Sequence, residues 1–330
     1  ETTDLVVLST SQIRALDETQ VNALSSNQAR SLLTSQVSNL TLAQVGSLSV
    51  DLLKTLKNNQ INALTTEQIQ VLGEGQVTSL NTSQVNGLSS TLLNALTDAQ
   101  IGQLTTAQTI VLTTANVAAL TSSQVLALNT SQVSTLLSTQ LQAIETQDIQ
   151  ALSVEQLNSI QSSTQLQSLS SAQLSALSLE QFGALQVAQL QKLSTGQVAS
   201  LSVPKLQTLN DDQLSGLSTT QLQSLTTTQF AGVLPTQIGA LTTAQVNKLT
   251  VAELQTLSSA QLDALTTAQL RALSTTQLTY VTTSSLAGLN DNSLSTLSTS
   301  QVGALTTDQV SNLTSSQVEN LVTAQIRILS

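Results

Sequence analysis

The sequence predicts an all-α solenoid built from very short helices, with one helix in each eight-residue repeat. Three observations support this fold class: an octad period along the chain, a helix-start signature in each octad, and a polarised placement of proline, glycine and charged residues. Helices this short are unstable alone because helix nucleation is unfavourable. We therefore expect an array in which each unit is stabilised by its neighbours.

The octad is defined by a consensus that repeats from Leu8 onward. The first units read LSTSQIRA, LDETQVNA and LSSNQARS, and the consensus is Leu-(Ser/Thr)-(Ser/Thr)-x-Gln-(Val/Leu/Ile)-x-small. Position 1 is Leu in all but four of forty units, and position 5 is Gln in thirty-two. Such regularity is specific to repeat architectures.

The array extends through the whole sequence with one interruption. Nineteen octads cover 8–159, a nine-residue unit covers 160–168 with its extra residue near 161–164, and twenty octads cover 169–328. We expect residues 1–330 to form a single continuous solenoid of about forty units. The sequence is interpreted as a fragment of a longer array.

Each octad carries the signals of a helix N-terminus. Position 2 is Ser, Thr, Asp or Asn in most units, and these residues are preferred N-caps. Gln three residues later completes a capping box, and the apolar residues at positions 1 and 6 form a hydrophobic staple. One continuous helix would rotate the Leu by about 80° per octad. The pattern thus predicts a helix over roughly positions 3 to 8.

Rarer residue types are distributed as a short helix requires. The two prolines, Pro204 and Pro235, fall at positions 4 and 3, in the predicted first turn. Nine of twelve glycines and seven of nine cations occupy positions 7 or 8, where a helix would end. Fifteen of seventeen acids in the framed units lie at positions 2 to 5, which matches the helix dipole; Asp263 and Glu319 do not. Lys57 and Lys205 are interpreted as surface variation.

A β-solenoid is the alternative fold. Thr, Val and Ile favour strands, and short-period repeats are common in β-helices. A strand would place positions 1 and 6 on opposite faces and would not explain the charge polarity. The sequence does not reveal how many octads make one coil.

Composition excludes several functions. The net charge is −10 with no basic patch, so nucleic acid is not an expected partner, and no apolar run approaches the ~20 residues of a membrane span. Without His or Cys, we expect no enzyme activity and no catalytic, cofactor-binding or metal-binding residues. The acidic groups at 210–212 and 290–292 lack known calcium-loop spacing, so we interpret them as helix N-termini.

The units Leu241–Val246 and Leu265–Leu270 resemble Leu-Thr-x-x-Gln-Val/Ile/Leu arrays of very large bacterial secreted or cell-surface proteins that are described as adhesin-like. The resemblance covers essentially the whole chain. It implies an extracellular or bacterial cell-surface location and a stalk or filament role, and it transfers no catalytic residue.

Two functions are consistent with these features. Forty equivalent units favour an extracellular structural filament, fibre or adhesin stalk that self-assembles head to tail or laterally, with cell-surface or matrix polysaccharide as a further partner. The alternative is a regular Ser/Thr/Gln surface that binds polysaccharide or ice, suggested by threonine pairs such as those at 105–106, 266–267 and 306–307.

Overall fold

The computed structural model of the protein describes residues 2–329 as short α-helices joined by brief linkers. No strand occurs in that range, so the predicted all-α repeat solenoid is confirmed and the β-solenoid alternative is wrong. The chain divides into two compact units, 1–169 and 170–330. Whether the two behave as one continuous solenoid stays a prediction.

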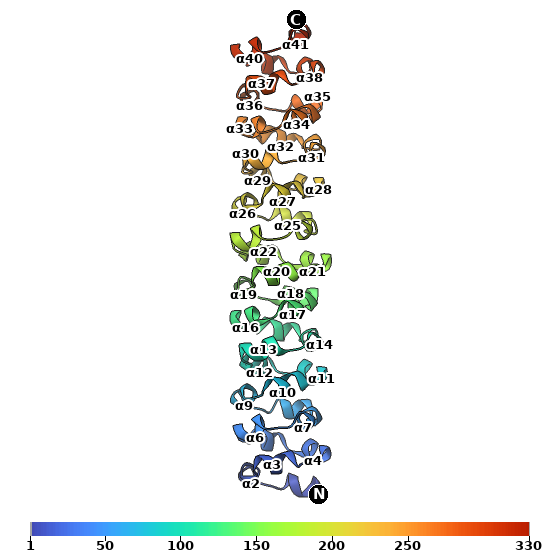
Figure 1. The fold of residues 1–330 in the computed structure, drawn as a ribbon, viewed down its shortest axis with the longest axis vertical. Coiled ribbons are helices and arrows are strands. Elements are labelled where there is room, and N and C mark those ends of the chain that lie inside the picture. The colour runs from blue at the N-terminus through green and yellow to red at the C-terminus, as the bar shows by residue number, and fades with distance from the viewer. Residues whose placement is uncertain (1, 330) are drawn as a thin grey trace. The chain divides into compact units, whose positions relative to one another are not determined.

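Unit 1 contains the helices α1 to α21, which rise coil upon coil in Figure 1. Their bounds are α1 Thr2–Val6, α2 Thr10–Ala15, α3 Glu18–Asn22, α4 Ser26–Ser31, α5 Thr34–Val37, α6 Leu42–Gly46, α7 Val50–Thr55, α8 Asn58–Ile61, α9 Thr66–Gln70, α10 Glu74–Ser79, α11 Thr82–Asn86, α12 Ser90–Ala95, α13 Asp98–Gln103, α14 Thr106–Thr109, α15 Thr114–Ala118, α16 Ser122–Ala127, α17 Thr130–Thr135, α18 Ser138–Ala143, α19 Thr146–Ile149, α20 Val154–Ser159 and α21 Ser163–Ser168.

Unit 2 contains the helices α22 to α41 in the same arrangement. Their bounds are α22 Ser171–Ala176, α23 Leu179–Gly183, α24 Val187–Leu190, α25 Thr195–Ala199, α26 Val203–Thr208, α27 Asp211–Ser215, α28 Thr219–Gln223, α29 Thr227–Ala231, α30 Pro235–Gly239, α31 Thr243–Asn247, α32 Val251–Thr256, α33 Ser259–Asp263, α34 Thr267–Ala272, α35 Thr275–Leu278, α36 Thr283–Ala287, α37 Asp291–Ser295, α38 Thr299–Gly303, α39 Thr307–Ser311, α40 Ser315–Glu319 and α41 Thr323–Leu329.

The helix boundaries follow the octad as predicted. Helix α13 begins at position 3 of its octad, and its N-cap is Thr97 at position 2. Pro235 is the first residue of α30 and Pro204 the second of α26, where a missing N–H breaks no helical hydrogen bond. The helices have four to seven residues. In six-residue helices such as α2 the C-cap is the next Leu, Leu16, which is extended, whereas in shorter helices such as α3 the C-cap is a position-7 or position-8 residue, there Ala23, that keeps a right-handed helical conformation.

The core is built from positions 1 and 6. Their side chains are buried in interior coils, as at Leu96 and Ile101, and the two phenylalanines, Phe182 and Phe230, also occupy position 6 and are fully buried. Burying one Leu or Ile side chain stabilises a fold by about 1.5–3 kcal/mol. A helix of about six residues is unstable alone, so it depends on the burial of these side chains against neighbouring coils for its stability.

The coil period is longer than the repeat. Within each unit a helix packs against the helix three places further along, as α13 does on α16 and α38 on α41. Side-chain hydrogen bonds between successive coils join residues 25 to 31 positions apart. One turn of the solenoid therefore takes between three octads (24 residues) and four octads (32 residues).

Glycine lies near the helix ends as predicted, but for a different reason. No glycine among residues 2–329 has a positive φ, so none is needed for a left-handed helix cap. Instead the coils approach closely: a Cβ on Gly102 would lie 2.9 Å from the carbonyl oxygen of Ala127, and one on Gly239 would lie 2.7 Å from that of Ala264. These two contacts are tighter than side chains tolerate, so glycine at 102 and 239 reflects coil packing, whereas a Cβ on Gly46 would lie at an ordinary distance of 3.5 Å from the Val71 carbonyl oxygen.

The extra residue of the nine-residue unit lies in the linker before α21. That linker has three residues, 160–162, whereas the linker between α16 and α17 has two. Ser162, the N-cap of α21, makes no side-chain capping bond, whereas Ser153, the N-cap of the preceding helix α20, does. The insertion is thus absorbed in a loop, at the cost of one N-cap.

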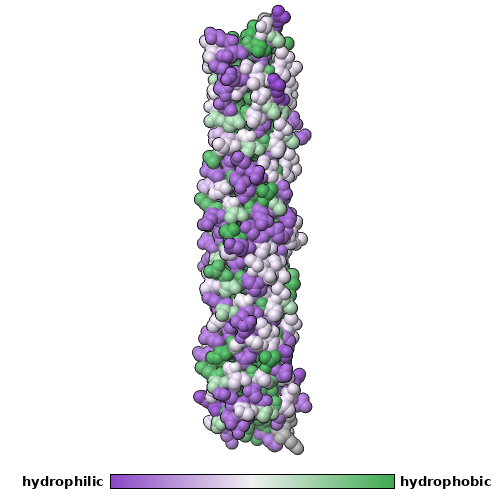
Figure 2. All heavy atoms as spheres, viewed as in Figure 1, coloured by the Kyte–Doolittle hydropathy of each residue, from purple (hydrophilic) through white to green (hydrophobic). Residues whose placement is uncertain are grey.

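The surface is polar between scattered apolar side chains. Figure 2 shows hydrophilic and near-neutral residues with isolated hydrophobic spots on the face in view. Exposed apolar residues such as Leu42, Leu126 and Leu179 sit at positions 3 or 7, outside the core positions.

Candidate functional site: a buried glutamine ladder

The glutamine at position 5 is the most distinctive side chain of the octad, and the structure buries it. Gln100 in α13 is 4% exposed, and the same position is buried in most interior coils of both units, with Gln277 and Ser293 half-buried. A buried amide costs about 1–3 kcal/mol unless its hydrogen bonds are made. The partners of this side chain therefore decide whether it stabilises the coil.

The oxygen of this glutamine closes the predicted capping box. The Thr97 N–H donates to Gln100 Oε1 (2.9 Å), and the Gln100 N–H donates to Thr97 Oγ1 (3.2 Å). The glutamine contact persists where position 2 has no acceptor: the N–H groups of Leu33 and Leu137 donate to Gln36 and Gln140. The N-cap side chain likewise keeps its bond where position 5 is not glutamine, as Ser49 Oγ accepts the Leu52 N–H (3.3 Å), so each half of the box forms without the other.

The amide nitrogen of the same side chain forms hydrogen bonds to the preceding coil. The capping-box pattern in the sequence does not predict this contact. Gln100 Nε2 donates to the carbonyl oxygens of Ile69 and Leu72, each at 2.9 Å. These oxygens belong to position 6 of α9 and to the Leu that follows α9, where helical carbonyls lack partners within the helix. One glutamine therefore caps the start of its own helix and the end of a helix four octads earlier.

This bridge recurs with a constant register. Gln132 reaches Ile101 and Leu104, Gln221 reaches Leu190 and Leu193, and Gln301 reaches Leu270 and Leu273, all at 2.7–2.9 Å and at separations of 31 and 28 residues. Gln165, after the insertion, reaches Leu136 at a separation of 29. We call this row of position-5 side chains the glutamine ladder.

Glutamine suits position 5 because its side chain has both an acceptor and two donor hydrogens. Its oxygen accepts the N-cap N–H, and its two amide hydrogens serve two carbonyls. Asn116 is shorter: its Nδ2 donates to one carbonyl oxygen, that of Leu88 (3.1 Å), and its Oδ1 accepts from Ser90 Oγ in the preceding coil (3.2 Å). Ser285 makes a single bridge, from its hydroxyl to the Leu257 carbonyl oxygen (2.5 Å).

Position 7 supplies a second set of bridges that sequence reasoning missed. Its amides donate to the position-8 carbonyl three octads later, as Asn22 does to Ser47 (2.8 Å) and Asn247 to Ala272 (2.9 Å). Arg271 uses its Nε–H in the same way on Thr296 (2.8 Å). The signal in the sequence is the excess of Asn and Gln at position 7, spaced three octads from a residue that ends a helix.

The two ladders compensate for one another. Where position 5 is Leu52 or Leu92, the N-cap N–H has no glutamine oxygen. In those octads the Ser49 N–H donates to Asn22 Oδ1 (2.7 Å), and the Ser89 N–H donates to Asn62 Oδ1 (2.8 Å).

Asp263 also compensates for a missing ladder glutamine. Its Oδ1 accepts the Asn290 N–H (3.0 Å) in the octad whose position 5 is Ser293. Asp263 is one of the two acids outside the predicted range, and this contact gives its physical reason.

Three charged residues also replace the ladder glutamine: Asp148, Lys205 and Glu253. Lys205 was predicted to be surface variation, yet its side chain is 4% exposed and its Nζ donates to the Ser175 carbonyl oxygen (2.5 Å). Burial lowers the pKa of the Lys205 ammonium. Asp148 accepts from Ser122 Oγ (2.5 Å). Lys57, by contrast, is an exposed N-cap residue.

The acidic groups considered for calcium lie at helix starts, as interpreted from sequence. Asn210 is the N-cap of α27, and Asp211 and Asp212 are in its first turn; Asn290 and Asp291 hold the same places in α37. Among residues 2–329 no three His, Cys, Asp or Glu side chains are arranged to hold a metal ion. No helix in that part of the chain is both long and apolar enough to cross a membrane.

Comparison with known proteins matches the start of the chain to a repeat family. Residues 1–33 match the family described as the ALTTAQ repeat. No curated protein shows significant similarity to the chain. The match supports a repeat array, in agreement with the octads and the coils described above.

Proposed function

We propose that the chain is a non-catalytic structural array, a segment of a stalk or filament located outside the cell or on a bacterial cell surface. The observation that carries this proposal is the glutamine ladder. Because successive coils within a unit are bridged by the same contacts, an array can be lengthened by adding octads without a new kind of interaction.

The composition supports the same role. The chain contains no Cys, Met or Trp and only one Tyr, so few of its side chains are open to oxidation. Charged residues make up 8% of the chain, and coil-to-coil contacts are hydrogen bonds and apolar packing, which salt screens weakly. Such contacts suit a protein exposed to changing ionic strength.

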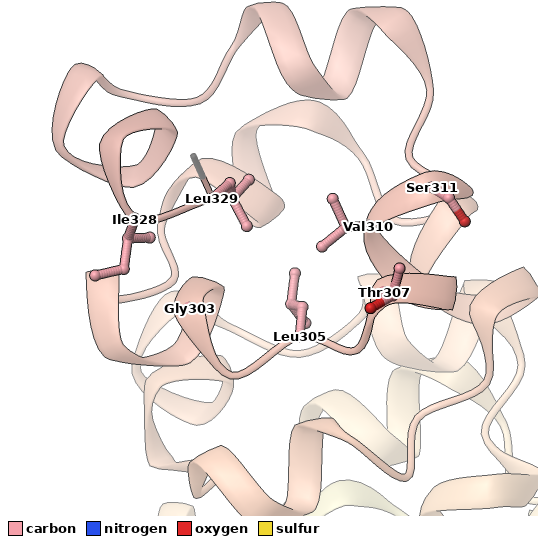
Figure 3. Close-up of a pocket in the computed structure, with 7 residues that line it drawn as sticks. All are labelled: Gly303, Leu305, Thr307, Val310, Ser311, Ile328 and Leu329. Atoms are coloured by element: carbon pink, nitrogen blue, oxygen red, sulfur yellow. The ribbon is translucent and has the colours of Figure 1, made fainter.

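Self-assembly is part of the proposal because successive coils of this array already pack on coils of the same kind. Leu305, Val310 and Leu329 lie around a hollow of about 350 Å³ (Figure 3). Head-to-tail stacking of two copies would use the same contacts as the coils within one copy and would continue the ladder.

Electron microscopy of two variants tests the structural role. In the first, the seven octads 64–119 are duplicated in place; in the second, a flexible Gly/Ser segment of the same length is inserted at the same point. The proposal expects the duplicated octads to lengthen the particle at constant width and the flexible segment to create a break. A globular particle whose length does not respond to added octads would contradict it.

Binding of polysaccharide or ice is the second candidate. In the threonine pairs, the first hydroxyl is used in capping, as Thr105 Oγ1 accepts the Gln108 N–H (3.2 Å). The second threonine, Thr106, is exposed, as are Thr267 and Thr307. Rows of exposed hydroxyls motivate glycan-binding and thermal-hysteresis measurements; a clear signal in either would favour this function over a stalk.

A further inference from the structure

Glu253, at N3 of helix α32, occupies a rung of the glutamine ladder with one of its oxygens unpartnered. Its Oε2 takes the role of the glutamine oxygen: it accepts the Thr250 N–H (2.6 Å) and the Thr250 hydroxyl (2.8 Å). Its Oε1 is buried without a hydrogen-bond partner, and the residue is 2% exposed. A buried carboxyl oxygen without a partner is costly.

The ladder register identifies what Oε1 faces. Residues 31 and 28 positions before Glu253 are Leu222 in α28 and Leu225 after it. In the octads on either side, the same place holds an amide donor: Gln245 Nε2 bonds to Leu217 (2.8 Å), and Gln261 Nε2 bonds to Val233 (2.7 Å). At the corresponding place Glu253 therefore has an oxygen where the neighbouring rungs have N–H groups.

We propose that Glu253 is a proton-dependent bridge between coils: the protonated carboxyl donates a hydrogen bond to the Leu222 or Leu225 carbonyl oxygen, and ionisation breaks this bridge and loosens the junction between α28 and α32. The neutral acid has one O–H donor and one accepting oxygen, which is the pattern of the glutamine it replaces.

The surroundings give the carboxylate no compensating charge. Helices α28, α29, α31, α33, α35 and α36 carry a single ionisable side chain, Asp263. In the other helices of these coils, Asp211, Asp212 and Asp291 are acids in the first turns of α27 and α37, and Arg271 of α34 is exposed and donates its Nε–H to the Thr296 carbonyl oxygen (2.8 Å). Asp263 accepts the Asn290 N–H. Lys248 lies in the linker before α32 and is exposed, and Tyr280 is 39% exposed. The end of α28 presents carbonyl oxygens, which disfavour a nearby anion.

These features act together on the titration of the group. Burial raises the pKa of the Glu253 carboxyl above its usual 4.5, although the bonds from Thr250 oppose this. A raised folded-state pKa means that the folded chain holds the proton more tightly than the unfolded chain. The stabilising contribution is complete below the unfolded pKa and is lost as pH rises toward the folded pKa.

The experiment compares the full chain with two variants of Glu253. Glu253→Gln restores the ladder amide, and Glu253→Leu places there a residue that the chain already accepts as Leu52 and Leu92. Urea unfolding and amide hydrogen exchange around 219–225 are measured from pH 4.5 to 8 at fixed ionic strength. The ¹³C shift of the Glu253 carboxyl is followed in parallel and assigned by its loss in Glu253→Gln.

The proposal expects the wild-type junction to weaken relative to Glu253→Gln as pH rises, by up to about tenfold in the opening constant per pH unit between the two pKa values. Glu253→Leu should show no such pH dependence, and the Glu253 carboxyl should titrate above the exposed glutamates. The proposal is overturned if wild type and Glu253→Gln respond identically to pH, or if the carboxyl titrates in the ordinary range. It is also overturned if Na⁺, K⁺ or Ca²⁺ at constant ionic strength selectively stabilises the wild type at pH 8, because the oxygens would then hold a cation.

Discussion

Helices α12 and α13 are neighbours in unit 1 and differ at the rung of the ladder. Leu92 in α12 and Gln100 in α13 hold the same octad position, and both are 4% exposed. Gln100 caps Thr97 and bridges to Ile69 and Leu72, whereas Leu92 only packs. The comparison separates two requirements of this position: a buried side chain of this size, and an amide that pairs the polar groups around it.

Leu92 is tolerated because another residue takes over part of the lost function. Asn62, four octads earlier, accepts the Ser89 N–H that would otherwise have no acceptor. Replacing a polar side chain by an apolar one costs little free energy of unfolding when its former partner finds another hydrogen bond. The cost is larger when that partner stays buried and unsatisfied. A coil therefore accepts an apolar rung when the N-cap N–H has a second acceptor.

The largest expected effect comes from truncating a rung. Gln100→Ala leaves a cavity and removes the acceptor of the Thr97 N–H and the donors to Ile69 and Leu72. We expect a loss of about 2–4 kcal/mol in the free energy of unfolding. Gln100→Leu, which keeps the volume, should lose clearly less. Urea denaturation of both variants measures the difference, and equal losses would show that the amide contributes nothing beyond volume.

The next largest effect is expected from removing Asn62, the acceptor that takes the place of the missing glutamine oxygen at α12. Asn62→Ala leaves the Ser89 N–H without an acceptor and should cost about 1–3 kcal/mol. Asn247→Ala is the matched control, since the Ser274 N–H is already capped by Gln277 (2.9 Å). The double variant Asn62→Ala with Leu92→Gln should recover most of the loss. A double-mutant cycle without coupling between positions 62 and 92 would refute the exchange of roles.

A smaller loss of stability is expected when only the N-cap side chain is removed. Thr97→Ala removes the acceptor of the Gln100 N–H but leaves Gln100 bound to the Thr97 N–H and to the preceding coil. The loss should be about 1 kcal/mol, as for other N-caps. Thermal unfolding should therefore rank Thr97→Ala between wild type and Gln100→Ala, and the opposite order would place the main contribution in the cap.

The smallest expected effect is a gain. Leu92→Gln alone adds a bridge to the Ile61 and Leu64 carbonyls while the Ser89 N–H is already paired with Asn62. A net stabilisation of about 0.5–1.5 kcal/mol is expected, the usual value of an added hydrogen bond. Destabilisation in this variant would indicate that the junction at α12 has repacked around leucine.

The local structure was predictable because each octad carries its own start and stop signals. Position 2 and Gln at position 5 specify the N-cap, and Pro235 and the acids confirm the direction of each helix. Burial of positions 1 and 6 followed from the staple. These features depend on residues within one octad, which are visible in the sequence.

The ladder was not predictable in the same way. The capping box explains Gln100 fully within its own octad, so nothing required its Nε2 to have a distant partner. The bridge to Ile69 depends on the number of octads per turn, which the repeat does not encode locally. For the same reason Lys205 was interpreted as a surface residue, and glycines at position 7, such as Gly102, were assigned to helix ends alone.

Hydrogen exchange of the glutamine side-chain amides tests the central claim most directly. Gln100 donates both Nε2 hydrogens to the preceding coil, whereas Gln12 is exposed and uses its Oε1 to cap Ser9. In a selectively ¹⁵N-labelled chain, with peaks assigned by Gln→Leu substitution, the Nε2 hydrogens of Gln100 should exchange at least about tenfold more slowly than those of Gln12. Equal exchange rates would contradict a glutamine ladder that holds successive coils together.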